Sequence, residues 1–197
     1  MPSLKIVALC IASAIVYGLV HDQITARVCI EYFTIGHPPV FSTESPTLLA
    51  LGWGIIATWW CGLILGVPLA LIARLGSWPK LSAADFRKPI AIQLVCMGVV
   101  AVIAGCSGYV AARAGWVELM EPLASEIPRQ VHVRFLAALW THLASYGTGF
   151  LGGLFIWGWA WRERTRRRTA ITVQNSLETL REANQGPLSP RVGDQRG

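Results

Sequence analysis

Residues His21–His37 read HDQITARVCIEYFTIGH, and the rest of the chain is arranged around this polar stretch. The stretch separates two long apolar runs and holds two of the four histidines, an aspartate and a glutamate. Gly36 ends any helix that precedes it, and Pro38 pushes His37 into an extended conformation. His37 is therefore predicted to lie on a stiff turn next to the apolar segments.

The apolar residues outside this stretch indicate a membrane protein. Hydrophobic residues make up 53% of the chain and charged residues only 14%, which is outside the usual balance of a soluble domain. Four windows approach or exceed the roughly 20 apolar residues that cross a bilayer core. They are residues 4–20, 48–75, 90–112 and 135–161. We predict an all-α fold in which residues 1–168 form four transmembrane helices packed as a compact bundle.

The distribution of basic residues predicts the orientation of the bundle. Cytoplasmic loops hold an excess of lysine and arginine. Here these residues collect in the connector 74–88 and directly after the last window, whereas the other two loops are acidic or mixed. Both termini are therefore expected in the cytoplasm. This topology explains the net charge of +6 without a nucleic-acid partner.

The sequence also predicts how the two ends of the chain are organised. Ala12-Ser13-Ala14 resembles a signal-peptide cleavage site, but the apolar stretch before it is very short, so we predict an uncleaved first helix. Residues 169–197 are predicted to be a cytoplasmic tail with a short helix over 170–183 and disorder from residue 185. Four of the five cysteines fall in apolar windows and Cys29 has no obvious partner, so no disulfide framework is expected.

With this topology all four histidines lie on the outer side of the membrane, together with two acidic residues. Imidazole and carboxylate are the ligands of zinc, iron, manganese and copper sites. On one helix, His132 and His142 would be about 15 Å apart along the axis, too far to share an ion. The predicted metal ligands are His21, His37 and His142, and the predicted catalytic carboxylates are Asp22 and Glu31. Supporting roles around them are assigned to Thr25, Tyr32, His132 and Tyr146.

His142 carries most of this hypothesis, because an ionisable side chain inside a span is costly and is by default a functional candidate. The alternative is that neutral His142 hydrogen-bonds a neighbouring helix. Asp22 could equally cap a short helix running through Thr25 toward Ile30, and Glu31 could pair with Arg27 four residues earlier. No H-E-x-x-H, paired E-x-x-H or C-x-x-C motif is present in the sequence.

The functions compatible with these patterns fall into three classes. The first is a metal-dependent enzyme at the outer, periplasmic face, whose ion activates water or dioxygen against a membrane-interface substrate. The second is a non-catalytic subunit or scaffold that binds a membrane protein or a second copy. Its Gly62 and Gly66 have the G-x-x-x-G spacing of close helix pairs. The third is a haem b protein with His21 and His142 as axial ligands.

A basic run follows the last window. Its arginines are expected to anchor the topology and to bind anionic lipid headgroups. Those assigned to headgroups are Arg164, Arg166, Arg167 and Arg168.

The segment Tyr17–His37, YGLVHDQITARVCIEYFTIGH, resembles a motif in small uncharacterised bacterial membrane proteins that pair HDQ-x-T with a downstream EYFT. The resemblance implies a multi-pass protein of the bacterial inner membrane. It also implies that five residues act as a unit, and it says nothing about the reaction. These residues are His21, Asp22, Thr25, Glu31 and Tyr32.

Overall fold

The computed structural model describes residues 1–185, and every regular element in that range is helical. The α-helices are α1 (Pro2–Val28), α2 (Glu31–Thr34), α3 (Pro46–Ile56), α4 (Trp59–Arg74), α5 (Ala83–Arg113), α6 (Leu123–Glu126) and α7 (His132–Gln185). A 3₁₀ turn at Arg129–Val131 precedes α7. The predicted all-α class is confirmed.

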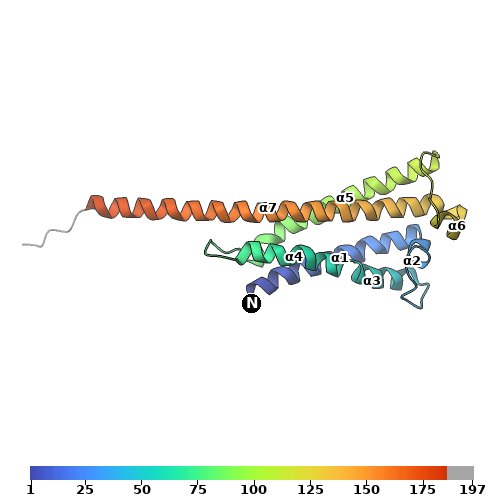
Figure 1. Ribbon diagram of the computed structural model, residues 1–197, viewed down its shortest axis with the longest axis horizontal. Helices are drawn as coiled ribbons and strands as arrows, with labels where there is room; N and C mark the ends of the chain where they lie inside the picture. Colours follow the sequence, from blue (N-terminus) through green and yellow to red (C-terminus); the bar gives the residue numbers. More distant parts are fainter. Residues whose placement is uncertain (186–197) are drawn as a thin grey trace, which may run out of the picture.

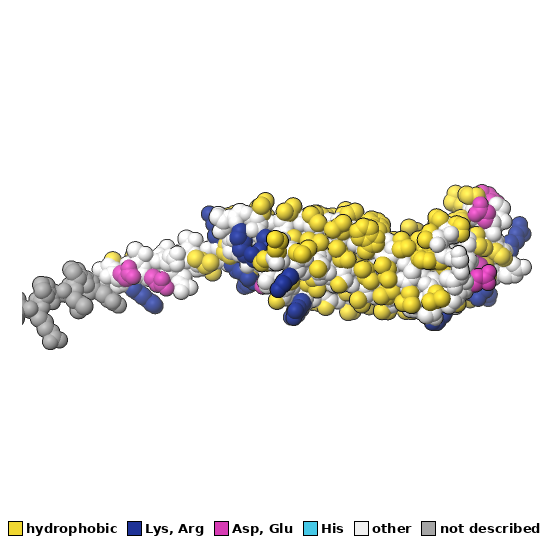
Figure 2. All heavy atoms as spheres, turned by 90° about the horizontal axis from the view of Figure 1, so that it is seen from below, with side chains coloured by type: hydrophobic (Ala, Val, Ile, Leu, Met, Phe, Trp, Pro, Cys, Tyr) yellow, Lys and Arg dark blue, Asp and Glu magenta, His cyan; other side chains and the backbone are white. Residues whose placement is uncertain are grey.

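Three segments are long and apolar enough to cross a membrane: Pro2–Val28, Pro46–Arg74 and Ala83–Arg113. They correspond to the first three predicted spans. The fourth predicted span lies within α7 and is not among them. Its N-terminal half includes Thr141, His142, Ser145 and Thr148, which make it less apolar than the other three. Apolar side chains cover the sides of the bundle, as Figure 2 shows.

The long helices form two sets. α1 packs along α3 and α4, and α5 packs along α7, as Figure 1 shows. Contacts of α1 with α5 and of α4 with α7 join the two sets. The C-terminal part of α7 extends past the bundle.

Glycines bring α1 close to α3 and α4. A Cβ atom on Gly18 would lie 2.5 Å from the carbonyl oxygen of Gly54, and one on Gly62 would lie 2.6 Å from the Cα atom of Ile11. Gly66 also faces α1, near Cys10. Such backbone contacts are possible only where side chains are missing. The helix that packs on Gly62 and Gly66 is therefore α1 of the same chain, so these glycines do not support the binding of a partner protein.

Two buried clusters hold the bundle at its ends. The cluster at the α2 end includes Phe33, Trp53 and Phe135, and the cluster at the opposite end includes Ile6, Leu81 and Phe86. A large cavity borders on both clusters. The bundle is thus packed solidly at its two ends and is hollow between them.

The observed helices differ from the predicted ones in three places. α1 does not stop at residue 20 and Asp22 does not cap a new helix, because α1 continues to Val28 with Asp22 buried inside it. The window 48–75 matches the apolar segment Pro46–Arg74, but Ala57 and Thr58 interrupt the helix within it, between α3 and α4. The window 135–161 and the tail helix 170–183 are parts of one helix, α7. Of the predicted disordered tail, residues 186–197 lie outside the described part of the chain.

We expect Gly62→Ala to destabilise the protein by roughly 1–3 kcal/mol, because the added methyl group would overlap the backbone of α1. Gly98→Ala is the matched control, since no atom lies within 4 Å of its Cβ position. That control should be neutral or stabilising, as alanine favours the helix. Unfolding of both variants in detergent micelles measures the difference. Equal stability of the two variants would contradict this packing.

Candidate metal centre

The candidate site joins two helices that are far apart in the sequence. His21 and Asp22 lie in the last two turns of α1, and His142 lies in the third turn of α7. Asp22 and His142 are buried, and the side chain of His21 is only 10% exposed. The three residues offer ligand atoms that all lie within 4.8 Å of one another.

One carboxylate oxygen is shared by both imidazoles. Oδ1 of Asp22 lies 3.1 Å from Nδ1 of His21 and 3.3 Å from Nε2 of His142. Two ligands on one tetrahedral zinc ion, with bonds of about 2.0–2.2 Å, are separated by about 3.4 Å. The spacing around Asp22 therefore approaches that of ligands on a common ion.

The hydrogen bonds of His142 restrict where its proton lies. Its Nδ1 is 2.9 Å from the carbonyl oxygen of Ala138, which can only accept, so Nδ1 carries a proton. In a neutral ring, Nε2 then presents a lone pair to Asp22. Nε2 of His142 and Oδ1 of Asp22 would then be two hydrogen-bond acceptors 3.3 Å apart, and this contact requires a metal cation or a second proton between them. A ligating histidine typically donates its other N–H to a backbone carbonyl, as His142 does here.

His21 has an unused nitrogen. Its Nε2 is buried without a hydrogen-bond partner, and no other buried side-chain nitrogen or oxygen in the described residues lacks one. When Nδ1 ligates a metal ion, the proton is on Nε2. In that state Nε2 is a donor without an acceptor among the described side chains and backbone.

Aromatic rings enclose the three residues. The ring of Tyr32 stacks on His142 with centroids 4.2 Å apart, and that of Tyr17 stacks on His21 at 5.6 Å. The Tyr17 hydroxyl is 2.7 Å from Oγ of Ser145 on α7. These contacts fix both imidazole planes and exclude water from one side of the site.

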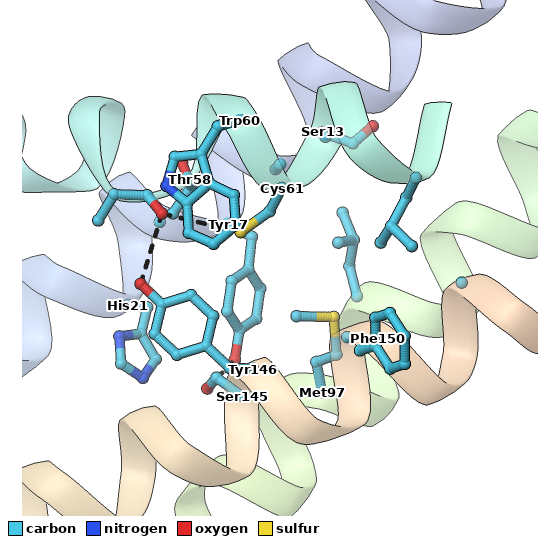
Figure 3. Close-up of a pocket in the computed structure, with 18 of the residues that line it drawn as sticks. Ser13, Tyr17, His21, Thr58, Trp60, Cys61, Met97, Ser145, Tyr146 and Phe150 are labelled. Carbon is cyan, nitrogen blue, oxygen red and sulfur yellow. Dashed lines mark hydrogen bonds between the residues drawn. The ribbon is translucent and has the colours of Figure 1, made fainter. Parts of the chain in front are cut away.

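The site lies at one end of a cavity of about 320 Å³. Figure 3 shows Tyr17, His21, Ser145 and Tyr146 together at this end, with Met97 and Phe150 farther along. Helices α1, α4, α5 and α7 all contribute to the walls. The interruption at Ala57 and Thr58 also borders the cavity, where the Tyr146 hydroxyl donates to the carbonyl of Ala57 at 3.4 Å. Irregular backbone at membrane depth is tolerated where it lines such a cavity.

The structure assembles only part of the predicted metal set. His37 borders the same cavity but is outside the three-residue group, and its Nδ1 donates to the carbonyl of Tyr32 at 2.7 Å. Glu31 does not pair with Arg27, and it accepts a hydrogen bond from the thiol of Cys29 instead. Arg27 donates to Gln23 and Thr47. Glu31 is therefore not at the site.

Of the four residues with predicted supporting roles, two lie at the site or its cavity and two do not. Tyr32 contacts His142 directly, and Tyr146 lines the cavity. The hydroxyl of Thr25 donates to the carbonyl of His21, so Thr25 supports α1 rather than a ligand atom. His132 is hydrogen-bonded to the carbonyl of Ile127 at the start of α7.

Two residues of the site were not predicted, Tyr17 and Ser145. Tyr17 precedes His21 by four residues and so shares its helix face, which is a signal that the sequence contains. Ser145 follows His142 by three residues and has the same signal.

Cys29 lies outside the three-residue group, and its thiol is hydrogen-bonded to Glu31. Its side chain is buried, and burial together with the nearby Glu31 carboxylate raises the pKa of Cys29 to about 11. It therefore remains protonated at neutral pH.

The predicted headgroup arginines are engaged within the protein to different degrees. Arg164 is buried and donates to the carbonyls of Ile72, Leu75, Trp78 and Pro79. It thus satisfies the end of α4 and is not available to lipid. Arg167 binds Asp85 and Glu163, Arg166 binds Glu163, and Arg168 lies over the ring of Trp78.

Comparison of the chain with protein-family models, curated proteins and solved structures found no match. The likeness of Tyr17–His37 to small bacterial membrane proteins therefore stays a prediction.

Stability should depend on pH through His37. Burial lowers the pKa of His37 below its ordinary value of 6.5, and the hydrogen bond to Tyr32 opposes this only in part. Near pH 6.5 the unfolded chain takes up a proton that the folded protein does not, so the free energy of unfolding falls as the pH drops. His37→Gln removes this titration. We expect its stability to fall less than that of the wild type between pH 7.5 and 5.5 in detergent, whereas parallel curves would exclude this role.

Proposed function

We propose that His21, Asp22 and His142 bind a transition-metal ion at the polar end of the cavity. The observation that carries this proposal is the shared Oδ1 of Asp22, which faces a nitrogen of each imidazole at 3.1 and 3.3 Å. The proton held on Nδ1 of His142 by the carbonyl of Ala138 supports Nε2 as the ligand atom. Zinc, iron, manganese and copper all accept this ligand set.

The chemistry we propose is metal-dependent catalysis at the membrane interface. A bound ion would lower the pKa of a coordinated water or, if redox-active, bind dioxygen. Asp22 contacts both imidazoles through one oxygen, which leaves its second oxygen to accept a proton from a bound water.

We further propose that the part of α7 within the bundle is the fourth span, with both termini in the cytoplasm of a bacterial cell. It runs along α5, and exposed apolar side chains such as Leu143, Phe150 and Leu151 lie on it. The basic residues Arg162–Arg168 follow it directly, as expected of an inner boundary.

The geometry does not support haem between His21 and His142. Their ring centroids are 4.4 Å apart in an edge-to-face arrangement. Axial ligands lie on opposite faces of the macrocycle, and this separation leaves no room for the macrocycle between the rings.

Metal analysis of protein purified without chelator tests the metal site. We expect about one transition-metal ion per chain in the wild type and its loss in His21→Ala and His142→Ala, since each variant removes a ligand. His132→Ala is the control, because His132 lies outside the cluster, and it should keep the ion. The elution profile on size exclusion shows whether each variant is folded. Wild-type protein without a transition metal would contradict the proposal.

A second candidate function, a subunit that associates with another copy, is favoured by the exposed end of α7. Residues 168–184 are exposed to solvent along this helix. Val173, Leu177 and Leu180 follow one another at intervals of four and three residues, which is the spacing of a coiled-coil seam. This end of α7 has no other helix packed against it in the described chain, and a helical stretch without such packing is marginal in water. A partner helix would therefore stabilise it.

Light scattering of the protein in detergent tests this association. We expect an oligomer for the wild type and a smaller species for the double variant Leu177→Asp, Leu180→Asp, because charges disrupt an apolar seam. Glu178→Ala is the matched control on the polar face and should leave the mass unchanged. A monomeric wild type would exclude this seam. Metal content should be the same in all three proteins.

A further inference from the structure

The cavity beyond the three-residue group is long and apolar. On α7 its lining extends from His142 to Trp157, fifteen residues or about 22 Å along the helix axis. Its far end is formed by Leu69, Ile90 and Ile156, which belong to the buried cluster at that end of the bundle. This length is comparable with much of the hydrocarbon thickness of a bilayer, about 30 Å.

The charged and imidazole groups of this cavity are confined to one end. Away from that end, the amide of Gln93 is hydrogen-bonded to the carbonyl of Thr148 at 2.7 Å, the indole N–H of Trp157 donates to the carbonyl of Leu65 at 2.9 Å, and Ser13 adds one hydroxyl. Toward the site end lie Asp22, three imidazoles and the hydroxyls of Tyr17, Ser145 and Tyr146. A ligand that matches this distribution has one polar end and one long apolar end.

Two glycines of α7 line the cavity where side chains of the opposing helices approach. A Cβ atom on Gly149 would meet Met97 of α5, and one on Gly153 would meet Leu65 of α4. A larger residue at either position would collide with the cavity wall, so these glycines fix how closely α7 lies to α4 and α5.

The cavity is bordered by residues that also face the outside of the bundle. Trp60 and Ile64 of α4 line it and are 44% and 53% exposed, and Tyr146 and Phe150 of α7 line it and are 42% and 54% exposed. Figure 3 shows Trp60 on the α4 side and Tyr146 and Phe150 on the α7 side. Within a membrane these residues face hydrocarbon, so the cavity opens sideways to lipid between α4 and α7.

We infer that this cavity binds the hydrocarbon tail of a single-chain lipid, which enters from the bilayer between α4 and α7 and places its polar head against His21, Asp22 and His142. The inference rests on the proposed metal site, and it names the substrate class on which that site would act. The volume of about 320 Å³ is at the lower end of ligand pockets, which suits one chain rather than a two-chain lipid.

The register of the lipid is tested with two photoreactive palmitic acids, one with a diazirine at the methyl end and one with a diazirine near the carboxylate. The protein is reconstituted in phosphatidylcholine vesicles, irradiated and mapped by peptide mass spectrometry. The methyl-end probe should label Leu69, Ile90 or Trp157, and the other should label Tyr17 or Tyr146. Excess unlabelled palmitic acid should suppress both.

A variant that fills the cavity supports the mapping. Ala14→Phe adds a ring to the lining and should reduce competable labelling roughly tenfold, an occupancy loss of about 1.4 kcal/mol. Val102→Phe adds the same ring to an exposed position on α5 and should label like the wild type. If Ala14→Phe does not fold, the residues that each probe labels in the wild-type protein test the inference by themselves.

Two results would overturn the inference. One is labelling confined to outward-facing positions such as Val95 and Leu151 and insensitive to competitor. The other is labelling in which the two probes exchange ends. If wild-type protein contains the metal but gives either result, the lipid assignment fails and the metal site stands. Correct, competable labelling of a protein without metal would instead leave a lipid-binding cavity and reject the proposed metal function.

Discussion

The carboxylate of Asp22 places the strongest constraint on this structure, because it is buried among apolar helices. An ionised carboxylate without a partner in such surroundings is very costly, and buried charges are therefore paired or bound to a metal. The side-chain partners of Asp22 are His21, one residue away, and His142, on the other side of the bundle. Pairing with His142 requires α1 and α7 to place these two residues side by side at the same level along the bundle axis.

The remaining packing is consistent with that requirement. Small residues let α1 lie directly against α3 and α4, as at Gly18 and Gly62, so one half of the bundle is tightly joined. α5 and α7 form the other half. The halves meet at the two buried clusters and through contacts of α4 with α7, and the cavity lies between the clusters, next to the site. The same arrangement that pairs Asp22 with His142 thus creates a space for a ligand.

The arrangement also links the site to the membrane. The imidazoles and Asp22 are shielded by aromatic rings, whereas the cavity beside them borders on helix faces that are apolar outside as well as inside. Under the function that we propose, ligands reach the polar end of this cavity through lipid rather than through water. A metal ion at this position would act on the head of a lipid while the walls hold its tail.

The sequence by itself determined the helical class and the first three apolar segments, and it named His21, Asp22 and His142 among the candidate site residues, because long apolar runs and ionisable residues beside them have few physical explanations. Only the tertiary structure decided which of the outer polar residues meet. His37 and Glu31 have the right chemistry, but Tyr32 and Cys29 engage them locally. The continuation of α1 through Asp22 could not be read from sequence, because a polar residue near the end of an apolar run normally marks its exit from the membrane. Here the partner that keeps Asp22 buried lies 120 residues away, on α7.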